Sequence, residues 1–507
     1  MGLSRAVVPL WLISALLASS CRLTQCANDE TVWDPVISGL FGGEVGAGAE
    51  LNWATNIGYT GEIVTVHSIQ EVQEVVRNST KVKALGSRHS FSRVSDTSEV
   101  LISMGEMNRV LEVKDRSVRV EGGITYSQLS EHLSSNGYAL KNLASLPHIS
   151  VAGSIGTATH GSGAMIGNLA TAVHSLTIVM ADGNVRKFKG DEVEQVVVHL
   201  GALGIVVELE LETVPTFQIQ QCVYTDMELD VSDFSYAYKN MATSAYSISL
   251  FTLFKNKKPG VISLTSVWLK KLVTNSNVKD AADVCTDSTL HGAPLTPHKV
   301  HPLPDISDTS PVTDMSAASW HLRLPHFTAE GTPSNGHGEE LQAEYFINRR
   351  FLKRALQLIT ENLSDDLAPI LKISEIRLIK GDNLLMSPCY GQAVNKDDPE
   401  RPLSFIGADG VSLVQEGACS SIHFTLVKDL PAVIPVLAKV EEILREFKAK
   451  PHWGKVFAMS PSEVRRMYGD SLDDFQKLVK KYDAKKKFSN FFLDTFIHSH
   501  KSDHNEL

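Results

Sequence analysis

Short hydrophobic runs alternate with amphipathic segments through the first part of the chain. Runs such as 82–85 are typical of buried strands, and 205–213 alternates hydrophobic with charged residues as a half-exposed strand does. Ser68 and Glu71 have the spacing of a capping box, which predicts a helix starting there. The pattern over residues 50–215 therefore predicts alternating strands and helices, without an internal repeat.

The pattern changes after about residue 215. Strand-like runs occur at 247–251 and 261–268, and helical patterns return at 349–363 and 432–447. These changes divide the chain into a first domain at 50–215, a second at 216–445 and a C-terminal segment at 446–497.

Prolines are concentrated between the two groups of elements in the second domain. Residues 294–333 contain seven of the 20 prolines of the chain, which excludes a regular helix there. The segment is either a linker or a long ordered excursion, and Trp320 and Phe327 within it favour packing.

Both ends of the chain carry patterns typical of targeting signals. Arg5 precedes a short hydrophobic run and then small residues, so we expect residues 1–27 to be a secretory signal peptide. The polar tail 498–507 ends in HNEL, which is similar to the retrieval signals of the endoplasmic reticulum (ER) lumen. We therefore expect the ER lumen, with a retrieval receptor as partner, or secretion if the tail is not recognised. Asn78 and Asn362 lie in N-x-S/T sequons, which makes them candidate glycan sites.

Composition excludes several classes of protein. Hydrophobic residues make up 43% and charged residues 21% of the 507 residues, which is typical of a globular protein. The net charge of −10 argues against a nucleic-acid partner. Apart from the N-terminal run, no stretch is long and hydrophobic enough to predict a transmembrane helix.

The cysteines give no metal-binding pattern. Six in the whole chain are too few for a disulfide-based scaffold, and their spacing fits no metal site. Four lie beyond the expected signal peptide and can pair in an oxidising lumen: Cys222, Cys285, Cys389 and Cys419. The pairing is open, although Cys389 and Cys419 flank one polar stretch and could close a loop.

Three segments are rich in small residues. GSRHSF at 86–91 follows a predicted strand, but it is not the dinucleotide fingerprint of glycines that open a helix. The segment 144–163 is dense in glycine and hydroxyl groups and poor in charge, which suits a loop around a polyanionic, hydroxylated ligand. GALG at 201–204 lets the backbone pass close to a flat group before a strand begins.

Polar side chains also interrupt hydrophobic strands. Glu375 and Arg377 are two residues apart and so share a face, as do His423 and Thr425. A buried Glu–Arg pair is often purely structural. Together with a histidine and with Lys455, the pair is more typical of a site for a polyhydroxylated substrate.

These segments together resemble the vanillyl-alcohol-oxidase-like flavoprotein family, and most of all its alditol (xylitol/sorbitol) oxidases, with the aldonolactone oxidases as relatives. The resemblance extends from about Asn52 to Phe496 and rests on four motifs in order: ASLPHISVAGS at 144–154, THGSG at 159–163, GALG at 201–204 and HWGK at 452–455. It implies an α+β fold, with a two-lobed FAD-binding domain of the PCMH type. It also implies a substrate domain whose antiparallel sheet covers the flavin, and a chain end that returns to the FAD side.

The resemblance implies FAD as cofactor, bonded covalently through His89. Arg88 stands where relatives often have glycine. The positions implied to contact FAD are Gly86, Ser87, Arg88, His89, Ser90, Ser145, Ser150, Gly153, Thr157, Ala158, Thr159, His160, Val206 and His452.

The resemblance also implies the chemistry. His423 would take the proton of a terminal CH–OH while hydride passes to the flavin, and dioxygen would then become hydrogen peroxide. Lys455, Glu375 and Arg377 would assist catalysis, and the implied substrate contacts are Ser145, Glu375, Arg377, Thr425 and Lys455. The expected substrate is a polyol; the alternatives are an aldonolactone, or a silent carbohydrate-binding protein on the same scaffold.

Overall fold

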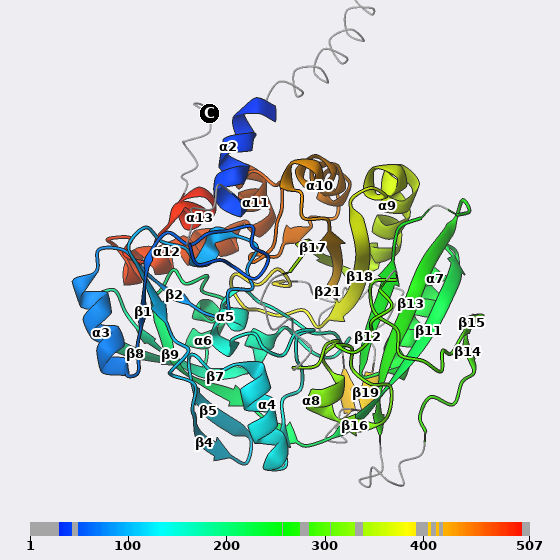
Figure 1. Ribbon diagram of the computed structural model, residues 1–507, viewed down its shortest axis with the longest axis horizontal. Helices are drawn as coiled ribbons and strands as arrows, with labels where there is room; N and C mark the ends of the chain where they lie inside the picture. Colours follow the sequence, from blue (N-terminus) through cyan, green and yellow to red (C-terminus); the bar gives the residue numbers. More distant parts are fainter. Residues whose placement is uncertain are drawn as a thin grey trace, which may run out of the picture.

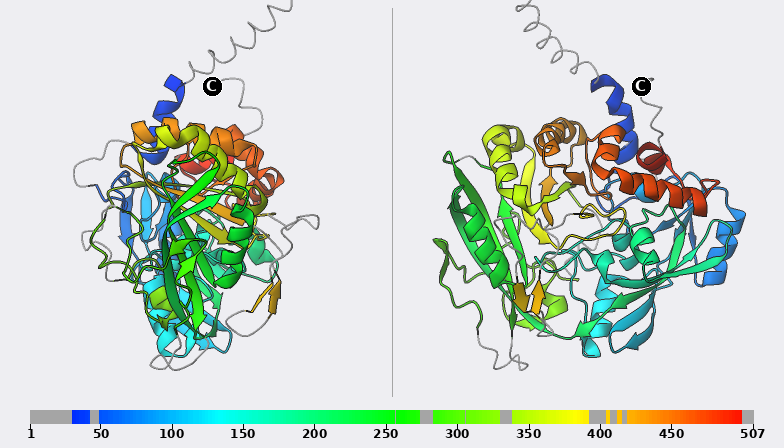
Figure 2. Two further views of the ribbon diagram at one scale, coloured as in Figure 1. Left: turned by 90° about the vertical axis from the view of Figure 1, so that its right-hand side faces the viewer. Right: turned by 180° about the vertical axis from the view of Figure 1, so that it is seen from behind.

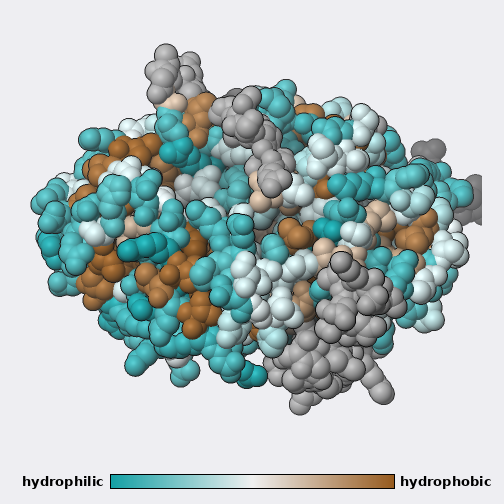
Figure 3. All heavy atoms as spheres, turned by 60° about the horizontal axis from the view of Figure 1, so that its bottom comes forward, coloured by the Kyte–Doolittle hydropathy of each residue, from teal (hydrophilic) through white to brown (hydrophobic). Residues whose placement is uncertain are grey.

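The computed structural model describes residues 30–42, 49–255, 257–273, 283–304, 306–329, 338–391, 404–406, 412–414 and 419–498. The expected signal peptide at 1–27, the HNEL tail and most of the polar stretch at 391–420 lie outside these residues. Among the helices that are described, none combines the length and hydrophobicity needed to cross a membrane. The face drawn in Figure 3 carries hydrophobic side chains in separate groups among hydrophilic ones.

The first part of the chain forms two lobes, each built on its own sheet. The first is a parallel sheet in the order β1-β3-β2, with α3 (Ile69–Asn78) beside it: β1 (Glu62–Thr65), β3 (Val100–Ser103) and β2 (Val82–Leu85). The second is an antiparallel sheet in the order β4-β5-β9-β7-β8: β4 (Val110–Lys114), β5 (Ser117–Glu121), β9 (Ile205–Glu212), β7 (Val173–Val179) and β8 (Val185–Lys189). The two lobes lie together on one side of the molecule (Figure 1).

The second part is dominated by one antiparallel sheet in the order β16-β11-β13-β12-β18-β21-β17-β22. The central strands are β12 (Ser247–Thr252), β18 (Leu371–Ile379), β21 (Cys419–Leu426) and β17 (Leu341–Asn348). The others are β16 (Ala318–Ser319), β11 (Gln218–Asp230), β13 (Val261–Val273) and β22 (Lys450–Pro451). Figures 1 and 2 place α7 (Phe234–Ser244) on the outer side of this sheet and the two lobes on its inner side. The expected α+β fold, with an antiparallel sheet facing a two-lobed domain, is therefore confirmed.

Local capping sets where the helices begin. Ser460 caps α11 (Pro461–Tyr468), because its side chain accepts a hydrogen bond from the backbone of Glu463. α10 (Leu430–Arg445) begins two residues earlier than the hydrophobic pattern predicts, because Asp429 accepts from the Ala432 backbone. α9 (Leu352–Leu367) begins three residues later than predicted, because Arg349–Phe351 form a 3-10 turn.

The described part of the proline-rich segment is packed against the second domain. Trp320 begins the short helix α8 (Trp320–Arg323), is fully buried, and donates its backbone N–H to Phe217 O. This described part is therefore a packed excursion rather than a linker, and His326 within it is buried.

The C-terminal segment joins both parts of the molecule. Its strand β22 pairs with β17 of the large sheet, and α12 (Asp470–Tyr482) follows α11. Farther on, Asn490 donates to the backbone oxygens of Arg93 and Asp96, each at 2.8 Å. The chain end thus returns to the first lobe.

Two disulfides cross-link residues of the second domain. Cys222 of β11 is bonded to Cys285, and Cys389 is bonded to Cys419 of β21. The second bond closes the polar stretch, as the positions of those two cysteines suggested.

Candidate active site

One cavity lies where the two lobes, the large sheet and the C-terminal segment meet. Its volume is about 700 Å³, within the range of cofactor and ligand pockets. Ser87 and Gly153 line it from the lobes, Glu375 from β18, and Lys455 from the C-terminal segment.

The structure brings nearly all of the sequence-predicted site residues to this cavity. Those that line it are Gly86, Ser87, Arg88, His89, Ser90, Ser145, Ser150, Gly153, Thr157, Thr159, His160, Val206, His452, Glu375, Arg377, His423, Thr425 and Lys455. Ala158 is not among the lining residues: it is buried, and its backbone takes a positive φ of 56° between two threonines that do line the cavity.

One end of the cavity is formed around His89, just after β2. Its ring centroid lies 4.4 Å from that of His148 and 5.4 Å from that of Trp53. Burial, with His148 adding to it, lowers the pKa of His89 to about 3, so the imidazole is neutral and nucleophilic at neutral pH. Arg88 has a φ of 63°, which explains why glycine suits this position; its side chain pairs with Glu50.

This end of the cavity fits FAD. Trp53 Nε1 and His199 Nε2 are buried without a hydrogen-bond partner, so they are donors or acceptors available to a ligand. A Cβ atom at Gly86 would lie 2.5 Å from Ser150 Oγ, so only glycine permits this close approach of the backbone. Ser150 is the N-cap of α5 (Val151–Gly156) and lines the cavity. Its side chain makes no capping hydrogen bond to the first turn of the helix.

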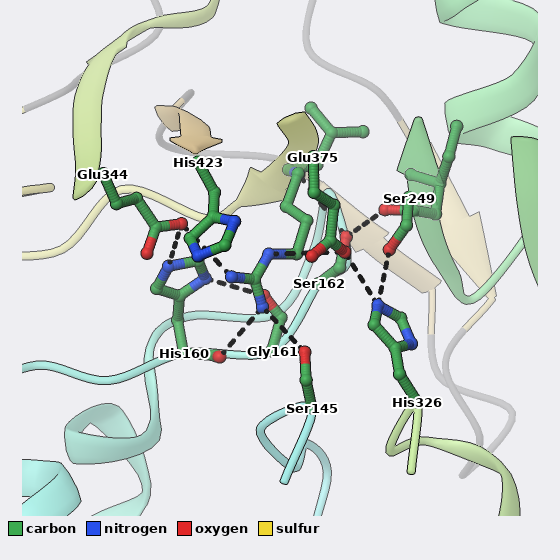
Figure 4. Close-up of polar contacts among 12 residues, drawn as sticks. Ser145, His160, Gly161, Ser162, Ser249, His326, Glu344, Glu375 and His423 are labelled. Carbon is green, nitrogen blue, oxygen red and sulfur yellow. Dashed lines mark hydrogen bonds and ion pairs between the residues drawn. The ribbon is translucent and has the colours of Figure 1, made fainter. Parts of the chain in front are cut away.

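The other end of the cavity is organised by Glu344 of β17, which sequence reasoning missed. Its carboxylate, 1% exposed, accepts hydrogen bonds from Lys455 Nζ at 2.6 Å and Arg377 Nη2 at 3.2 Å. His160 Nε2 lies 3.0 Å from the same carboxylate, and Nδ1 of that ring lies 2.8 Å from Gly161 O. Burial raises the pKa of Glu344, but the positive charge of Lys455 and the other two partners holds it well below its usual range. Figure 4 shows His160 turned toward Glu344, with a dashed line for the contact between them.

Glu375 is the second carboxylate of this end. Its Oε1 lies 3.6 Å from Arg377 Nε and accepts a hydrogen bond from His326 Nε2 at 2.7 Å. Burial raises its pKa, and Arg377 and His326 lower it by more, so Glu375 is ionised. Behind His326, Lys270 Nζ lies 3.1 Å from Nδ1.

His423 of β21 faces the same space. Its Nε2 lies 3.2 Å from Gln342 Oε1, and the Gln342 amide nitrogen donates to Glu340 at 2.7 Å. The amide oxygen of Gln342 therefore accepts from His423 Nε2, which leaves Nδ1 as a lone pair; this atom is buried without a partner. Burial, with Lys455 adding to it, holds the pKa of His423 well below its usual value, so the ring is neutral.

The remaining predicted residues lie around these groups. Ser145 Oγ accepts from Arg377 Nη1 at 3.4 Å, and Thr425 follows His423 on the same face of β21. His452 Nδ1 accepts from the Gly454 backbone at 3.0 Å, and burial holds the pKa of His452 well below its usual value.

The charges of the ion-pair cluster around Arg377 balance. Two ionised carboxylates, Glu344 and Glu375, face two cations, Arg377 and Lys455. Among the described residues that line the cavity here, no cation is left over to bind a carboxylate or phosphate of a substrate. Hydrogen-bond donors and acceptors of both kinds are instead presented to a neutral, hydroxylated molecule.

Two family models match the sequence. A model described as FAD binding domain matches residues 62–189, and one described as D-arabinono-1,4-lactone oxidase matches residues 412–496. Alditol oxidase of a Streptomyces species is 36% identical over 462 residues, covering 88% of this chain and 98% of that protein. L-gulonolactone oxidase of Scyliorhinus torazame is 24% identical, covering 87% and 97% of the two chains.

A solved structure shares the fold. The crystal structure of cholesterol oxidase from B. sterolicum superposes with a TM-score of 0.66, at 12% sequence identity, over 89% of this chain and 96% of that one.

Proposed function

This chain belongs to the family of FAD-dependent oxidases that contains alditol oxidase and the aldonolactone oxidases, and from that premise we propose that it oxidises the terminal CH–OH of a polyol to an aldose. Dioxygen would take up the electrons and become hydrogen peroxide. The observation that carries the proposal is the charge-balanced ion-pair cluster at the polar end of the cavity, together with a lining histidine, His423, whose Nδ1 has no hydrogen-bond partner.

His423 is the proposed general base. Its Nδ1 carries a free lone pair and its Nε2–H is held by Gln342, so it can accept a hydroxyl proton without changing tautomer. Bound FAD supplies the hydride acceptor. Lys455 and Arg377 place positive charge where an alkoxide develops, and Glu375 accepts hydrogen bonds from other hydroxyls of the substrate.

A polyol is preferred over a lactone on two grounds. Alditol oxidase matches at 36% identity over nearly its whole length, whereas the mouse L-gulonolactone oxidase matches at 36% over 44% of its length. An open-chain polyol also offers several hydroxyl donors to the two carboxylates. The second candidate is an aldonolactone oxidase, favoured by the match of residues 412–496 to the D-arabinono-1,4-lactone oxidase model.

We propose the ER lumen as the compartment. The signal-like residues 1–27 and the HNEL terminus support it, as do two disulfides, which persist in oxidising compartments. Asn78 and Asn362 are exposed, so both sequons are accessible to glycosylation. Retention of the protein by a retrieval receptor should disappear when the last four residues are deleted.

Peroxide release from xylitol, sorbitol and L-gulono-1,4-lactone tests the substrate. The protein is made in a secretory host and purified with its flavin. Peroxide from the polyols supports the proposal, and peroxide from the lactone alone moves the assignment to the second candidate. A flavoprotein that no polyol or lactone reduces, even without oxygen, would refute both.

We propose that FAD is bonded covalently to His89. The neutral ring of His89 lines the cavity and makes no hydrogen bond to the described residues, so its nitrogens are available to the flavin. After denaturing electrophoresis, flavin fluorescence should stay with the wild-type band and be lost with His89→Ala. A His148→Ala variant, which keeps the nucleophile, should retain it; fluorescence retained by His89→Ala would contradict the linkage.

A further inference from the structure

A buried lysine and histidine stand behind the substrate-facing carboxylate Glu375. Lys270 of β13 is fully buried, and its Nζ contacts Leu324 O at 2.5 Å, Pro325 O at 2.9 Å and His326 Nδ1 at 3.1 Å. Two of these partners are carbonyl oxygens and can only accept. Burial lowers the pKa of Lys270 to about 7, so the ammonium form is present at and below neutral pH. An ammonium has three N–H donors and no lone pair, so in this form His326 Nδ1 must accept from it.

That arrangement determines the tautomer of His326. With Nδ1 accepting from Lys270, the ring proton must be on Nε2, and Nε2 points at Glu375 Oε1 at 2.7 Å. Burial lowers the pKa of His326 to about 4, so the ring is neutral and has only this one proton to place. The opposite tautomer would set a nitrogen lone pair against a carboxylate oxygen.

We propose that Lys270 and His326 are positioning residues that fix Glu375 as an ionised hydrogen-bond acceptor for the hydroxyls of the substrate. The inference rests on the proposed polyol function and deepens it. A hydrogen-bonded relay runs from Lys270 on β13 through His326 in the proline-rich segment to Glu375 on β18. This relay would support recognition of the substrate hydroxyls beyond the reacting carbon. Lys270 itself does not line the cavity, so its effect on the substrate must pass through His326.

The relay predicts a specific kinetic pattern. Lys270→Met removes the donor that holds His326 Nδ1 as an acceptor, so the ring proton is no longer confined to Nε2 and the hydrogen bond to Glu375 weakens. Hydrogen bonds from the substrate hydroxyls to the charged Glu375 carboxylate are stronger than those between neutral groups. Disturbing Glu375 should therefore raise the dissociation constant of xylitol about 10- to 100-fold. The limiting rate of flavin reduction should change less, about threefold or below. Oxidation of 1,2-propanediol, which lacks the remote hydroxyls, should be nearly unaffected.

Two histidine variants separate tautomer control from packing. His326→Ala removes the donor and should weaken xylitol binding as Lys270→Met does. His326→Gln places an amide N–H near the original Nε2, and an amide has no tautomer to lose, so xylitol binding should be largely retained. For the same reason, adding Lys270→Met to His326→Gln should cost little further affinity.

The control and the refuting results follow from the same experiment. Lys450→Met removes another buried lysine that contacts a backbone carbonyl, Tyr390 O, outside the cavity lining; it should leave xylitol binding unchanged. Stopped-flow anaerobic reduction gives binding and rate separately for each holoenzyme. The inference is refuted if His326→Ala binds xylitol as the wild type does, or if Lys270→Met weakens binding equally with and without His326→Gln. A wild type that no polyol reduces would instead refute the proposed function.

Discussion

Glu344→Gln should be the most damaging single change at the polar end of the cavity. The substitution keeps the size of the side chain and removes its charge, leaving Lys455 and Arg377 buried with less compensation. Breaking a buried ion pair from one side costs about 3–5 kcal/mol. That range corresponds to roughly 2–4 pKa units. Burial lowers the pKa of Lys455 and Glu344 raises it, so loss of the Glu344 charge should lower the pKa of Lys455 further.

The sign of the pH effect follows from this. Lys455 contributes as a cation, and without Glu344 its pKa falls, so the cation is lost as the pH rises through that lower value. Activity of Glu344→Gln on the polyol should therefore decline toward alkaline pH, starting at a lower pH than in the wild type. The urea midpoint should fall as well, because the folded state now contains the unpaired charges.

A double substitution provides the control. Glu344→Gln with Lys455→Met removes both partners of the 2.6 Å pair, so part of the stability lost in the single variant should return. Denaturant unfolding, followed by circular dichroism and flavin fluorescence, measures both variants. If Glu344→Gln unfolds within about 1 kcal/mol of the wild type and keeps its pH profile, Glu344 does not organise the site as argued.

Three further outcomes are expected. His423→Asn should lower the rate of flavin reduction by about 10²- to 10⁴-fold while FAD stays bound, as anaerobic stopped-flow measurements would establish; a smaller loss would remove His423 from the role of base. Because burial depresses the pKa of His423, the wild type should keep this base unprotonated down to well below pH 6.5, so a fall in kcat/KM set by His423 near pH 6.5 would contradict the site geometry. Cys222→Ser with Cys285→Ser opens a link between residues 63 apart and should destabilise the second domain by about 4 kcal/mol in denaturant unfolding, with an unchanged midpoint as the contrary result.

The parts of the site that the sequence predicted are those with local signals. Glu375 and Arg377 are adjacent on one strand face, so their shared orientation follows from the period of two alone. The start of α3 likewise follows from Ser68 and Glu71, three residues apart. The glycine- and hydroxyl-rich segments contain many of the residues that line the cavity.

Glu344, His326 and Lys270 could not be found in that way, because each depends on contacts between distant segments. Glu344 is one charged residue in the run LQAEYFIN, and only the pairing of β17 with β21 sets it opposite His423. His326 lies in the proline-rich segment, and the path of the chain there depends on the burial of Trp320. Lys270 is one of two adjacent lysines in β13, and the alternation of the strand alone does not tell which is buried beneath the site.

The return of the chain end to the first lobe has a consequence for biosynthesis. His452 and Lys455 complete a cavity whose other walls are made from residue 53 onward, and Asn490 ties this segment to the backbone of Arg93 and Asp96. A ribosome-bound chain that stops short of this segment has both lobes and most of the large sheet, but an open cavity. Flavin loading therefore waits for release of the nearly complete chain, and truncated nascent chains should emerge without cofactor.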